Sequence, residues 1–220
     1  MTKISKTPYE IHITVKVDEN DENFNQNFKK NCDSIGVKPI VIEFESKGIT
    51  NKDVMTSSKH FGNDESVYIF SRDIILSLRE MGYNVIREKI ETIPWHPDAP
   101  FESKGLLPNG RYFESHIGVS ITPNMKSELN SFVNHLNLGK FKKFGGISKL
   151  SQNFFKKVKN GEYINMLTYR NYSCGYSEFK KDVDMIKFLL ESNGFSFEKV
   201  EVEYALYDSN IEHDNNWLLN

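Results

Sequence analysis

The chain has 220 residues and nearly balanced charge, because 28 Lys and Arg face 30 Asp and Glu for a formal net charge of −2. This balance excludes the strongly basic composition of proteins that bind nucleic acid over a whole surface. No apolar run reaches the roughly 20 residues of a membrane-spanning helix, and the polar N-terminus does not resemble a signal peptide. Cys32 and Cys174 lack the spacing of a metal site or a disulfide framework. We therefore expect an intracellular, cytoplasmic protein with no membrane partner.

The first half of the chain predicts the order β-α-β-β-α-β. Alternating polar and apolar residues indicate strands, and apolar residues at helical spacing indicate helices. Within the second helix, Val67, Ile74 and Leu78 share one face, and Gly82 suits its C-terminal cap. The predicted elements are strand 9–17, helix 20–34, strand 39–46, strand 54–61, helix 65–81 and strand 83–93.

A connector rich in proline follows at residues 94–111. Its prolines and its Asn109-Gly110 turn indicate an irregular, stiffened segment and not a flexible tether. Trp95 and Phe101 are expected to pack it against the rest of the molecule. The predicted division is a first lobe at 1–93, this connector, and a second lobe with a C-terminal tail at 112–220.

The second half predicts the same order of elements. Two such units define an α/β (α+β) fold of duplicated ferredoxin-like lobes with antiparallel sheets. Turn-forming residues after Tyr204 predict a strand end and a turn, and Trp217-Leu218-Leu219 predict an apolar clamp. The predicted elements are strand 112–121, helix 125–136, a strand near 146–150, strand 163–172, helix 176–192 and strand 195–207.

An internal repeat supports the duplication. The segment Tyr9–Val15 returns as Phe113–Val119, with Glu, His, Ile and Val at a constant offset of 104 positions. Farther along the offset becomes 112, which matches Thr56 with Thr168, Gly82 with Gly194 and Glu91 with Glu203. The change of offset places about eight extra residues in the second half, around 138–163. The lysines and aromatic residues in that stretch are expected to form a solvated surface, with nucleic-acid contact as the alternative.

The strand pattern predicts that each sheet has one apolar and one polar face. The apolar face, with Ile11, Ile13, Ile40 and Ile42, is expected to pack against the helices. If the two polar faces oppose each other, they form a cleft around a pseudo-twofold axis that contains both His12 and His116, a usual place for a ligand. Other predicted members of the polar faces are Glu10, Thr14, Glu43, Glu45, Thr56, Ser58, His60, Arg87, Lys89, Glu91, Glu114, Gly118, Ser120, Thr168, Arg170, Tyr172, Lys199, Glu201, Glu203 and Tyr207.

His12-Ile13-Thr14-Val15 resembles the His-x-Thr-x motif of the two-histidine phosphoesterase superfamily. The resemblance implies a hydrolase, a cyclic phosphodiesterase acting on a nucleotide or an RNA-end phosphate, without a cofactor. It makes His12 and His116 the general acid and base, with Thr14 as a phosphate ligand. The second motif has Gly118 where the family has Thr or Ser. Further expected phosphate ligands on the same faces are Thr56, Ser120, Thr168 and Arg170.

Two other functions remain open from the sequence. Loss of the second Thr and the acidic faces favour a non-catalytic protein that binds a ligand or a partner. The acidic residues also suggest a metal-dependent enzyme. The candidate ligands of a divalent ion are His12, His60, His116, Glu43 and Glu45.

Overall fold

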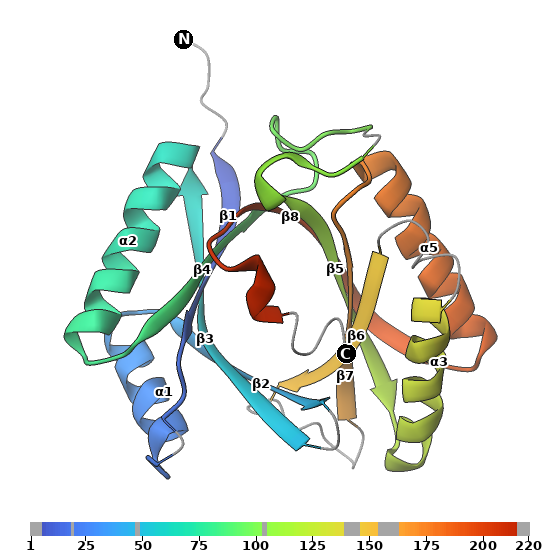
Figure 1. The fold of residues 1–220 in the computed structure, drawn as a ribbon, viewed down its shortest axis with the longest axis horizontal. Coiled ribbons are helices and arrows are strands. Elements are labelled where there is room, and N and C mark those ends of the chain that lie inside the picture. The colour runs from blue at the N-terminus through green and yellow to red at the C-terminus, as the bar shows by residue number, and fades with distance from the viewer. Residues whose placement is uncertain are drawn as a thin grey trace.

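Eight antiparallel strands form one closed barrel in the computed structural model, and the helices cover its outside (Figure 1). The structure describes residues 6–18, 20–46, 49–102, 105–138, 146–153 and 163–214. The strands are β1 (Thr7–Val15), β2 (Lys38–Ser46), β3 (Ile49–Gly62), β4 (Val85–Thr92), β5 (Tyr112–Ile121), β6 (Gly146–Asn153), β7 (Tyr163–Asn171) and β8 (Ser196–Asp208). The helices are α1 (Phe24–Ser34), α2 (Asp64–Glu80), α3 (Lys126–Leu138) and α5 (Tyr176–Ser192), with short 3-10 turns η1 (Pro108–Gly110), η2 (Pro123–Met125) and η4 (Ile211–Asp214).

Each half of the chain contributes four neighbouring strands in the ferredoxin-like order. The first half runs β4-β1-β3-β2 around the barrel, and the second half repeats this as β8-β5-β7-β6. Pairing of β2 with β6 and of β4 with β8 closes the barrel. The predicted α+β fold of duplicated ferredoxin-like units is confirmed. The expected cleft between the units is the interior of this barrel.

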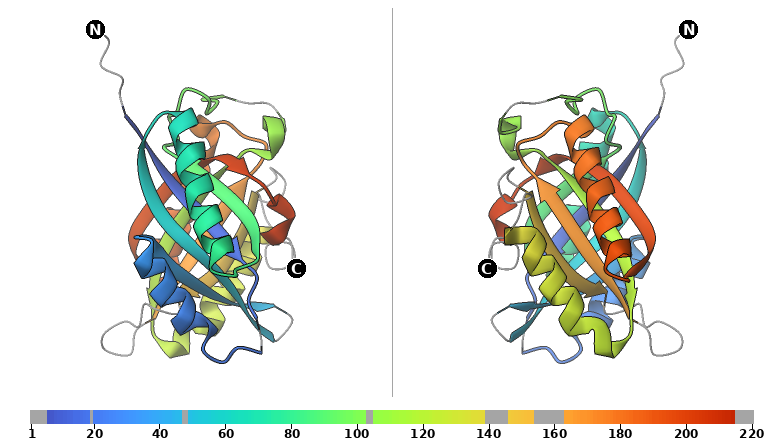
Figure 2. Two further views of the ribbon diagram at one scale, coloured as in Figure 1. Left: turned by 90° about the vertical axis from the view of Figure 1, so that its left-hand side faces the viewer. Right: turned by 90° about the vertical axis from the view of Figure 1, so that its right-hand side faces the viewer.

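The hydrophobic core lies between the barrel wall and the helices. Along β1, Ile11 and Ile13 are fully buried on the helix side, while Glu10 and His12, which alternate with them, point inward. Val67 and Leu78 of α2 are also fully buried. Because burial of apolar surface is the main favourable term in folding, this alternation decides which face of each strand points inward. In the side views α1 and α2 cover one side of the barrel, and α3 and α5 cover the opposite side (Figure 2).

The helix ends follow local capping chemistry. The Asn63 side chain accepts a hydrogen bond from the Ser66 backbone nitrogen, and the Ser66 hydroxyl accepts one from the Asn63 backbone nitrogen. These two bonds form a capping box at the start of α2. Gly82, which follows this helix, has a φ of 89°, as a left-handed C-terminal residue requires. Helix α1 begins at Phe24, later than predicted, because the Asp21 carboxylate accepts a hydrogen bond from the Asn23 backbone in a competing turn.

The connector is fastened to the barrel by backbone hydrogen bonds. The nitrogen of Tyr176 donates to Pro100, and the nitrogen of Leu107 donates to Tyr172, at 2.9 and 2.7 Å. Trp95 is 67% exposed, against the expectation that it packs on the lobes, whereas the Phe101 ring, although 65% exposed, lies edge-on to Tyr176 of α5 with centroids 6.4 Å apart. The division of the chain at residues 93 and 112 stays a prediction.

Some predictions fall outside the described residues. The interruption expected around 138–163 is described only for 146–153 and from 163 onward, and the clamp at 217–219 lies beyond residue 214. Among the described helices, none has the length and apolar character needed to cross a membrane.

Candidate functional site

A cavity of about 540 Å³ lies inside the barrel, and both predicted histidines line it. His12 comes from β1 and His116 from the matching position of β5, so the repeat brings the two imidazoles into one space. Charged and hydroxyl side chains from each of the eight strands surround them. These polar lining residues include Glu10, Thr14, Asp53, Ser57, Arg87, Lys89, Glu91, Glu114, Thr168, Arg170, Glu201 and Glu203.

His12 lies between a backbone carbonyl and two carboxylates. Its Nδ1 is 3.1 Å from the carbonyl oxygen of Thr56, which only accepts, so Nδ1 carries a proton. Its Nε2 is 3.3 Å from buried Glu91 and 3.7 Å from Glu10, which is 25% exposed. Burial opposes protonation of the ring, but the hydrogen bond and negative charge of Glu91 raise the pKa of His12 above its ordinary value.

His116 repeats this arrangement in the second half. Its Nδ1 is 3.0 Å from the hydroxyl of Thr168, and its Nε2 is 2.9 Å from buried Glu114 and 3.8 Å from partly exposed Glu203. Burial opposes protonation here as well, but the negative charge of Glu114 outweighs it and raises the pKa of His116 to about 9. Each histidine therefore contacts one buried and one open carboxylate, and His116 is an imidazolium at neutral pH.

Lys89 joins the two histidine sites. Its Nζ is 2.7 Å from Glu91 and 3.2 Å from Glu114, so it bridges carboxylates from the two halves. Burial acts against ionisation of all three groups. The charge of Lys89 nevertheless holds the pKa of Glu91 down to about 2, and Arg170 together with Lys89 holds that of Glu114 well below its usual range. These carboxylates are fixed anions that hold the histidines in place.

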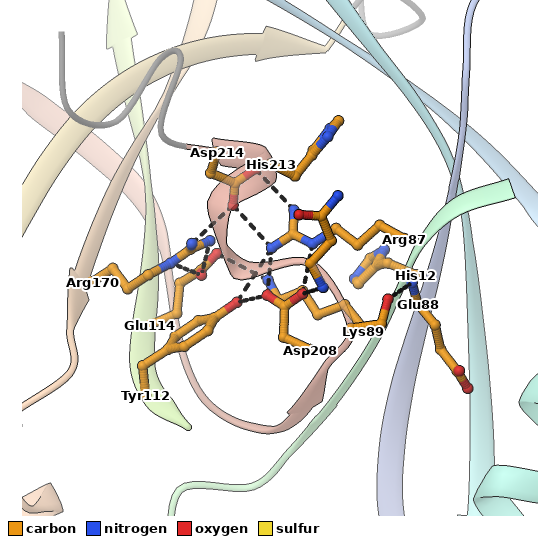
Figure 3. A network of polar contacts seen from close by, with 12 residues as sticks. His12, Arg87, Glu88, Lys89, Tyr112, Glu114, Arg170, Asp208, His213 and Asp214 are labelled. Carbon is orange, nitrogen blue, oxygen red and sulfur yellow. Dashed lines mark hydrogen bonds and ion pairs between the residues drawn. The ribbon is translucent and has the colours of Figure 1, made fainter. Parts of the chain in front are cut away.

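A second set of buried charges continues from Glu114 toward η4 (Figure 3). Arg170 donates two hydrogen bonds to Glu114, at 2.7 and 2.6 Å, and its Nη1 is 2.8 Å from Asp214. Asp214 also accepts from Arg87, at 2.8 Å. Arg87 in turn donates to Asp208 at 2.6 Å. Arg170 was expected to bind substrate, but it is 1% exposed and its guanidinium is already paired with these two carboxylates.

Sequence reasoning missed Asp208 and Asp214. Both were assigned to a turn after the last strand, yet both pair with Arg87, more than a hundred positions away in the first half of the chain. The signal that pointed to them was indirect. Arg87 and Arg170 had each been placed on an inward face, and a buried arginine requires a carboxylate partner.

The structure corrects the predicted face of Thr56. The pairing of β1 with β3 places Ser57 opposite His12, just as Thr168 lies opposite His116 on β7. The structural offset in these strands is therefore 111, and a shift of one residue moves a side chain to the other face. The Thr56 hydroxyl accepts a hydrogen bond from the Ile13 backbone at 3.2 Å and does not line the cavity. Ser57 lines it instead.

The predicted face of β2 is also reversed. Ile40 and Ile42 line the cavity, and Val41 is fully buried on the helix side. Both alternating sets on this strand contain apolar residues, so the pattern alone did not fix the face. Glu43 consequently points outward and forms an ion pair with Lys52 at 3.7 Å.

The remaining predicted residues divide between the cavity and the surface. Thr14 and Thr168 line the cavity as expected. Ser120 donates to exposed Glu198 at 3.1 Å and lies outside the cavity lining. His60 hydrogen-bonds Ser66 and stacks on Phe70. The five proposed metal ligands are therefore not brought together: only His12 and His116 line the cavity, and the side chain of Glu45 is outside the described residues.

Two other groups have metal-binding atoms within 4.8 Å of one another: Glu91 with His116 and Glu203, and Asp53 with His213 and Asp214. In the first, Glu91 already pairs with Lys89, and His116 with Glu114. In the second, two arginines neutralise Asp214. Because Glu91, His116 and Asp214 already pair with oppositely charged side chains, we assign a metal to neither group.

The network holds more carboxylates than permanent cations. When the pairs Asp53–His213 and Glu201–Lys199 are set aside, the ion-pair network contains six carboxylates and three Lys or Arg side chains. Glu203 shows the consequence: burial and then the nearby charge of Glu91 raise its pKa to about 7. The carboxylates are Glu10, Glu91, Glu114, Glu203, Asp208 and Asp214, and the basic side chains are Arg87, Lys89 and Arg170.

Comparisons with known proteins give no family for this chain. No protein-family model and no curated protein matches it. Among solved structures, a protein of Fusobacterium nucleatum provisionally described as a monooxygenase is 9% identical, with a TM-score of 0.34, and the alignment covers 92% of this chain and 94% of that one. A second, from Lactobacillus acidophilus and also provisionally described as a monooxygenase, is 13% identical, with a TM-score of 0.30 and coverage of 91% and 94%. A protein provisionally described as a chlorite dismutase is 11% identical, with a TM-score of 0.30 and coverage of 94% and 98%.

The expectation of a phosphodiesterase is corrected. These three solved structures are described as monooxygenases and a chlorite dismutase, and not as phosphodiesterases. At these identities and TM-scores the likeness gives this chain no activity of its own. The site also differs from a phosphate site, because each histidine nitrogen that faces the cavity is next to two carboxylates, which repel a phosphate.

Proposed function

We propose that this chain is an enzyme that transfers a proton to or from a small polar molecule bound inside the barrel. The observation that carries the proposal is the pair of histidines, each held between a buried and an open carboxylate, facing one cavity. Titratable groups with perturbed pKa values in a cavity are typical of catalytic acids and bases.

Glu203 is the proposed base. A carboxyl group with a pKa of about 7 exists in both protonation states at neutral pH, so it can accept a proton and return it. Its side chain is 20% exposed, so a ligand in the cavity can reach it. Glu114 cannot take this role, because Arg170 and Lys89 hold it as a buried anion.

His116 and His12 are the proposed positive charges beside developing negative charge; their ring nitrogens already contact Thr56, Thr168, Glu91 and Glu114, so they act through charge. Glu114 keeps the His116 ring positively charged at neutral pH, and an imidazolium stabilises an oxyanion formed when a neighbouring carbon loses its proton. Lys89 and Arg170 act as positioning residues, because they contact the carboxylates that hold the histidines. Removal of a proton next to a carbonyl group is the reaction class that needs this combination of a base and a nearby positive charge.

Isotope exchange tests this proposal without knowledge of the product. A mixture of small aldehydes, ketones and amino ketones in D₂O is followed by proton NMR with and without the protein. We expect the protein to accelerate the loss of one C–H signal, and Glu203→Gln to reduce that rate at least about 100-fold. Glu198→Gln, on the same strand but outside the cavity lining, is the matched control and keeps the rate. Equal exchange by the wild type and Glu203→Gln contradicts the assignment of the base.

The cysteines support a location inside the cell for this enzyme. Cys32 and Cys174 are both free and buried, as is usual in a reducing compartment.

A further inference from the structure

We infer that the molecule bound in the cavity is an organic cation with an apolar segment, such as an alkylamine or alkylguanidine, whose charged group lies against Glu10 and Glu203. The inference rests on the proposed function only in taking this cavity as the substrate site. Its support is the distribution of charge and of apolar side chains around the cavity.

The permanent cations of the network are already used by the buried carboxylates. Arg87, Lys89 and Arg170 are each less than 10% exposed, and every one of them contacts two carboxylates among Glu91, Glu114, Asp208 and Asp214. The three basic groups are therefore matched by four buried anions. Among the described residues, none of these three basic groups forms an ion pair with Glu10 or Glu203, the carboxylates nearer the opening.

In the part of the chain that the structure describes, the ion pairs of the two open carboxylates are with imidazoles. Among the described residues, Glu10 forms an ion pair with His12 at 3.7 Å, and Glu203 forms one with His116 at 3.8 Å. Each histidine lies closer to a buried carboxylate than to the open one. Lys38, Lys59 and Lys199 also line the cavity and are exposed to water, and Lys199 pairs with Glu201. Glu10 and Glu203 thus present acceptor oxygens to any molecule in the cavity, and an ammonium or guanidinium group offers only donors.

One part of the cavity wall is apolar. Ile40 and Ile42 from β2, Met55 from β3 and Met166 from β7 line it together with the charged residues. A cavity of about 540 Å³ is in the range that holds a small organic ligand. A ligand with a hydrocarbon segment next to its charged group satisfies both parts of the wall, whereas an inorganic cation satisfies only the carboxylates.

The proton equilibrium of Glu203 gives the inference a second readout. The titratable groups that face Glu203 are Glu91 and Lys89 on β4, His116 on β5 and His12 on β1. A bound cation replaces the proton on Glu203, so binding releases a proton and becomes stronger as pH rises from 6 to 8. With a pKa of about 7, the unprotonated fraction of Glu203 rises about tenfold over this range.

Three probes of one length and different charge test the inference by calorimetry in the presence of a chelator. Pentylamine is positive, pentanol is neutral and pentanoate is negative at pH 8. We expect pentylamine to bind at least about tenfold more tightly than pentanol, and pentanoate to bind least. We also expect Glu203→Gln and Glu10→Gln each to weaken pentylamine binding several-fold, with Glu198→Gln unchanged. Circular dichroism of each near-isosteric variant confirms its fold before the titration.

The outcomes separate the two proposals. Preferred binding of pentanoate, equal binding of pentylamine and pentanol, or no binding of pentylamine at millimolar concentration overturns the inferred ligand class. Selective pentylamine binding without isotope exchange of any amino ketone supports the ligand class and contradicts the proposed catalysis. Exchange confined to neutral substrates supports the catalysis and overturns the ligand class.

Discussion

Lys89 and Glu114 come from different halves of the chain, and the 3.2 Å contact between Lys89 Nζ and Glu114 Oε1 joins the two histidine sites. The contact completes a series of charge pairs that runs from His12 through Glu91, Lys89 and Glu114 to His116. The same lysine therefore holds both buried carboxylates as anions. The two histidine sites therefore share Lys89 as a common cation.

Replacing this lysine is expected to destabilise the whole barrel. Lys89→Met leaves Glu91 without its closest cation and removes one of the cations that neutralise Glu114, and an uncompensated buried charge costs about 3–5 kcal/mol. Urea denaturation at pH 7 measures the loss. Lys52→Met removes an exposed lysine from its pair with Glu43 and should cost less than about 1 kcal/mol. Equal losses for the two variants contradict the bridging role.

The charge of Asp214 is expected to fix η4 to the barrel. Asp214→Asn removes the anion between Arg87 and Arg170, both of which are buried, and should lower the free energy of unfolding by about 3–5 kcal/mol. Asp184→Asn is the control, because Asp184 pairs with two lysines on the exposed surface of α5 and should cost under about 1 kcal/mol. A small loss for Asp214→Asn in urea denaturation shows that the network does not need this carboxylate.

Stability is expected to fall as pH rises above 6.5. Below pH 6.5 His116 is protonated in both the folded and the unfolded chain, so its pairing with Glu114 contributes fully. Between pH 6.5 and its folded pKa of about 9, the unfolded chain loses this proton first, and the contribution decreases. The raised pKa of Glu203, about 7, acts in the same direction from pH 4.5 to 7.

We predict a loss of about 2 kcal/mol between pH 6.5 and 8.5, measured by urea denaturation. The range ends at 8.5 because burial raises the pKa of Cys32 and Cys174 to about 12, and their titration in the unfolded chain adds a further loss above that pH. His116→Gln should flatten the dependence. A wild-type stability that is constant or rises over this range runs against the predicted charge of His116.

The one-residue shift in β3 is expected to give neighbouring residues different roles. Ser57→Ala changes the cavity, because the Ser57 hydroxyl donates to Glu10 at 2.7 Å, and it should weaken binding of a cavity ligand with little loss of stability. Thr56→Val removes the acceptor for the Ile13 backbone and should cost about 1–3 kcal/mol without a direct effect on the ligand. Parallel calorimetry with pentylamine and urea denaturation distinguish the two. If Thr56→Val weakens pentylamine binding and Ser57→Ala lowers stability instead, Thr56 and not Ser57 faces the cavity, as the sequence predicted.

The elements themselves were predictable because their hydrophobic periods are strong. Helix α5 and strand β5 occupy the predicted residues, and the match of Glu91 with Glu203 at an offset of 112 is structural, since Glu91 lies opposite Glu10 and Glu203 lies opposite Glu114. The faces of β2 and β3 were less predictable. Apolar or hydroxyl residues stand at both alternating positions of these strands, so only the pairing register decides which side faces inward.

Closure of the barrel could not be read from local sequence. Within the described residues, β2 and β6 pair at Ile42–Asn153 and Glu43–Gln152, and nothing in either strand alone specifies that partner. The contacts of Asp208 and Asp214 depend on the same closure, since they reach arginines on β4 and β7. The two histidines were predictable because the sequence repeat contains both. The buried charge pairs around them were not predictable from the sequence.

Direct titration of His116 tests the proposed site most plainly. Proton–carbon NMR of the imidazole Cε1 resonances, assigned with His116→Gln and His12→Gln, follows the charge of each ring from pH 5 to 10. We predict a midpoint of about 9 for His116 in the wild type and a lower midpoint in Glu114→Gln, because that variant removes the charge that stabilises the imidazolium. A midpoint near 6.5 that Glu114→Gln does not change contradicts the charged histidine on which the proposed proton transfer depends.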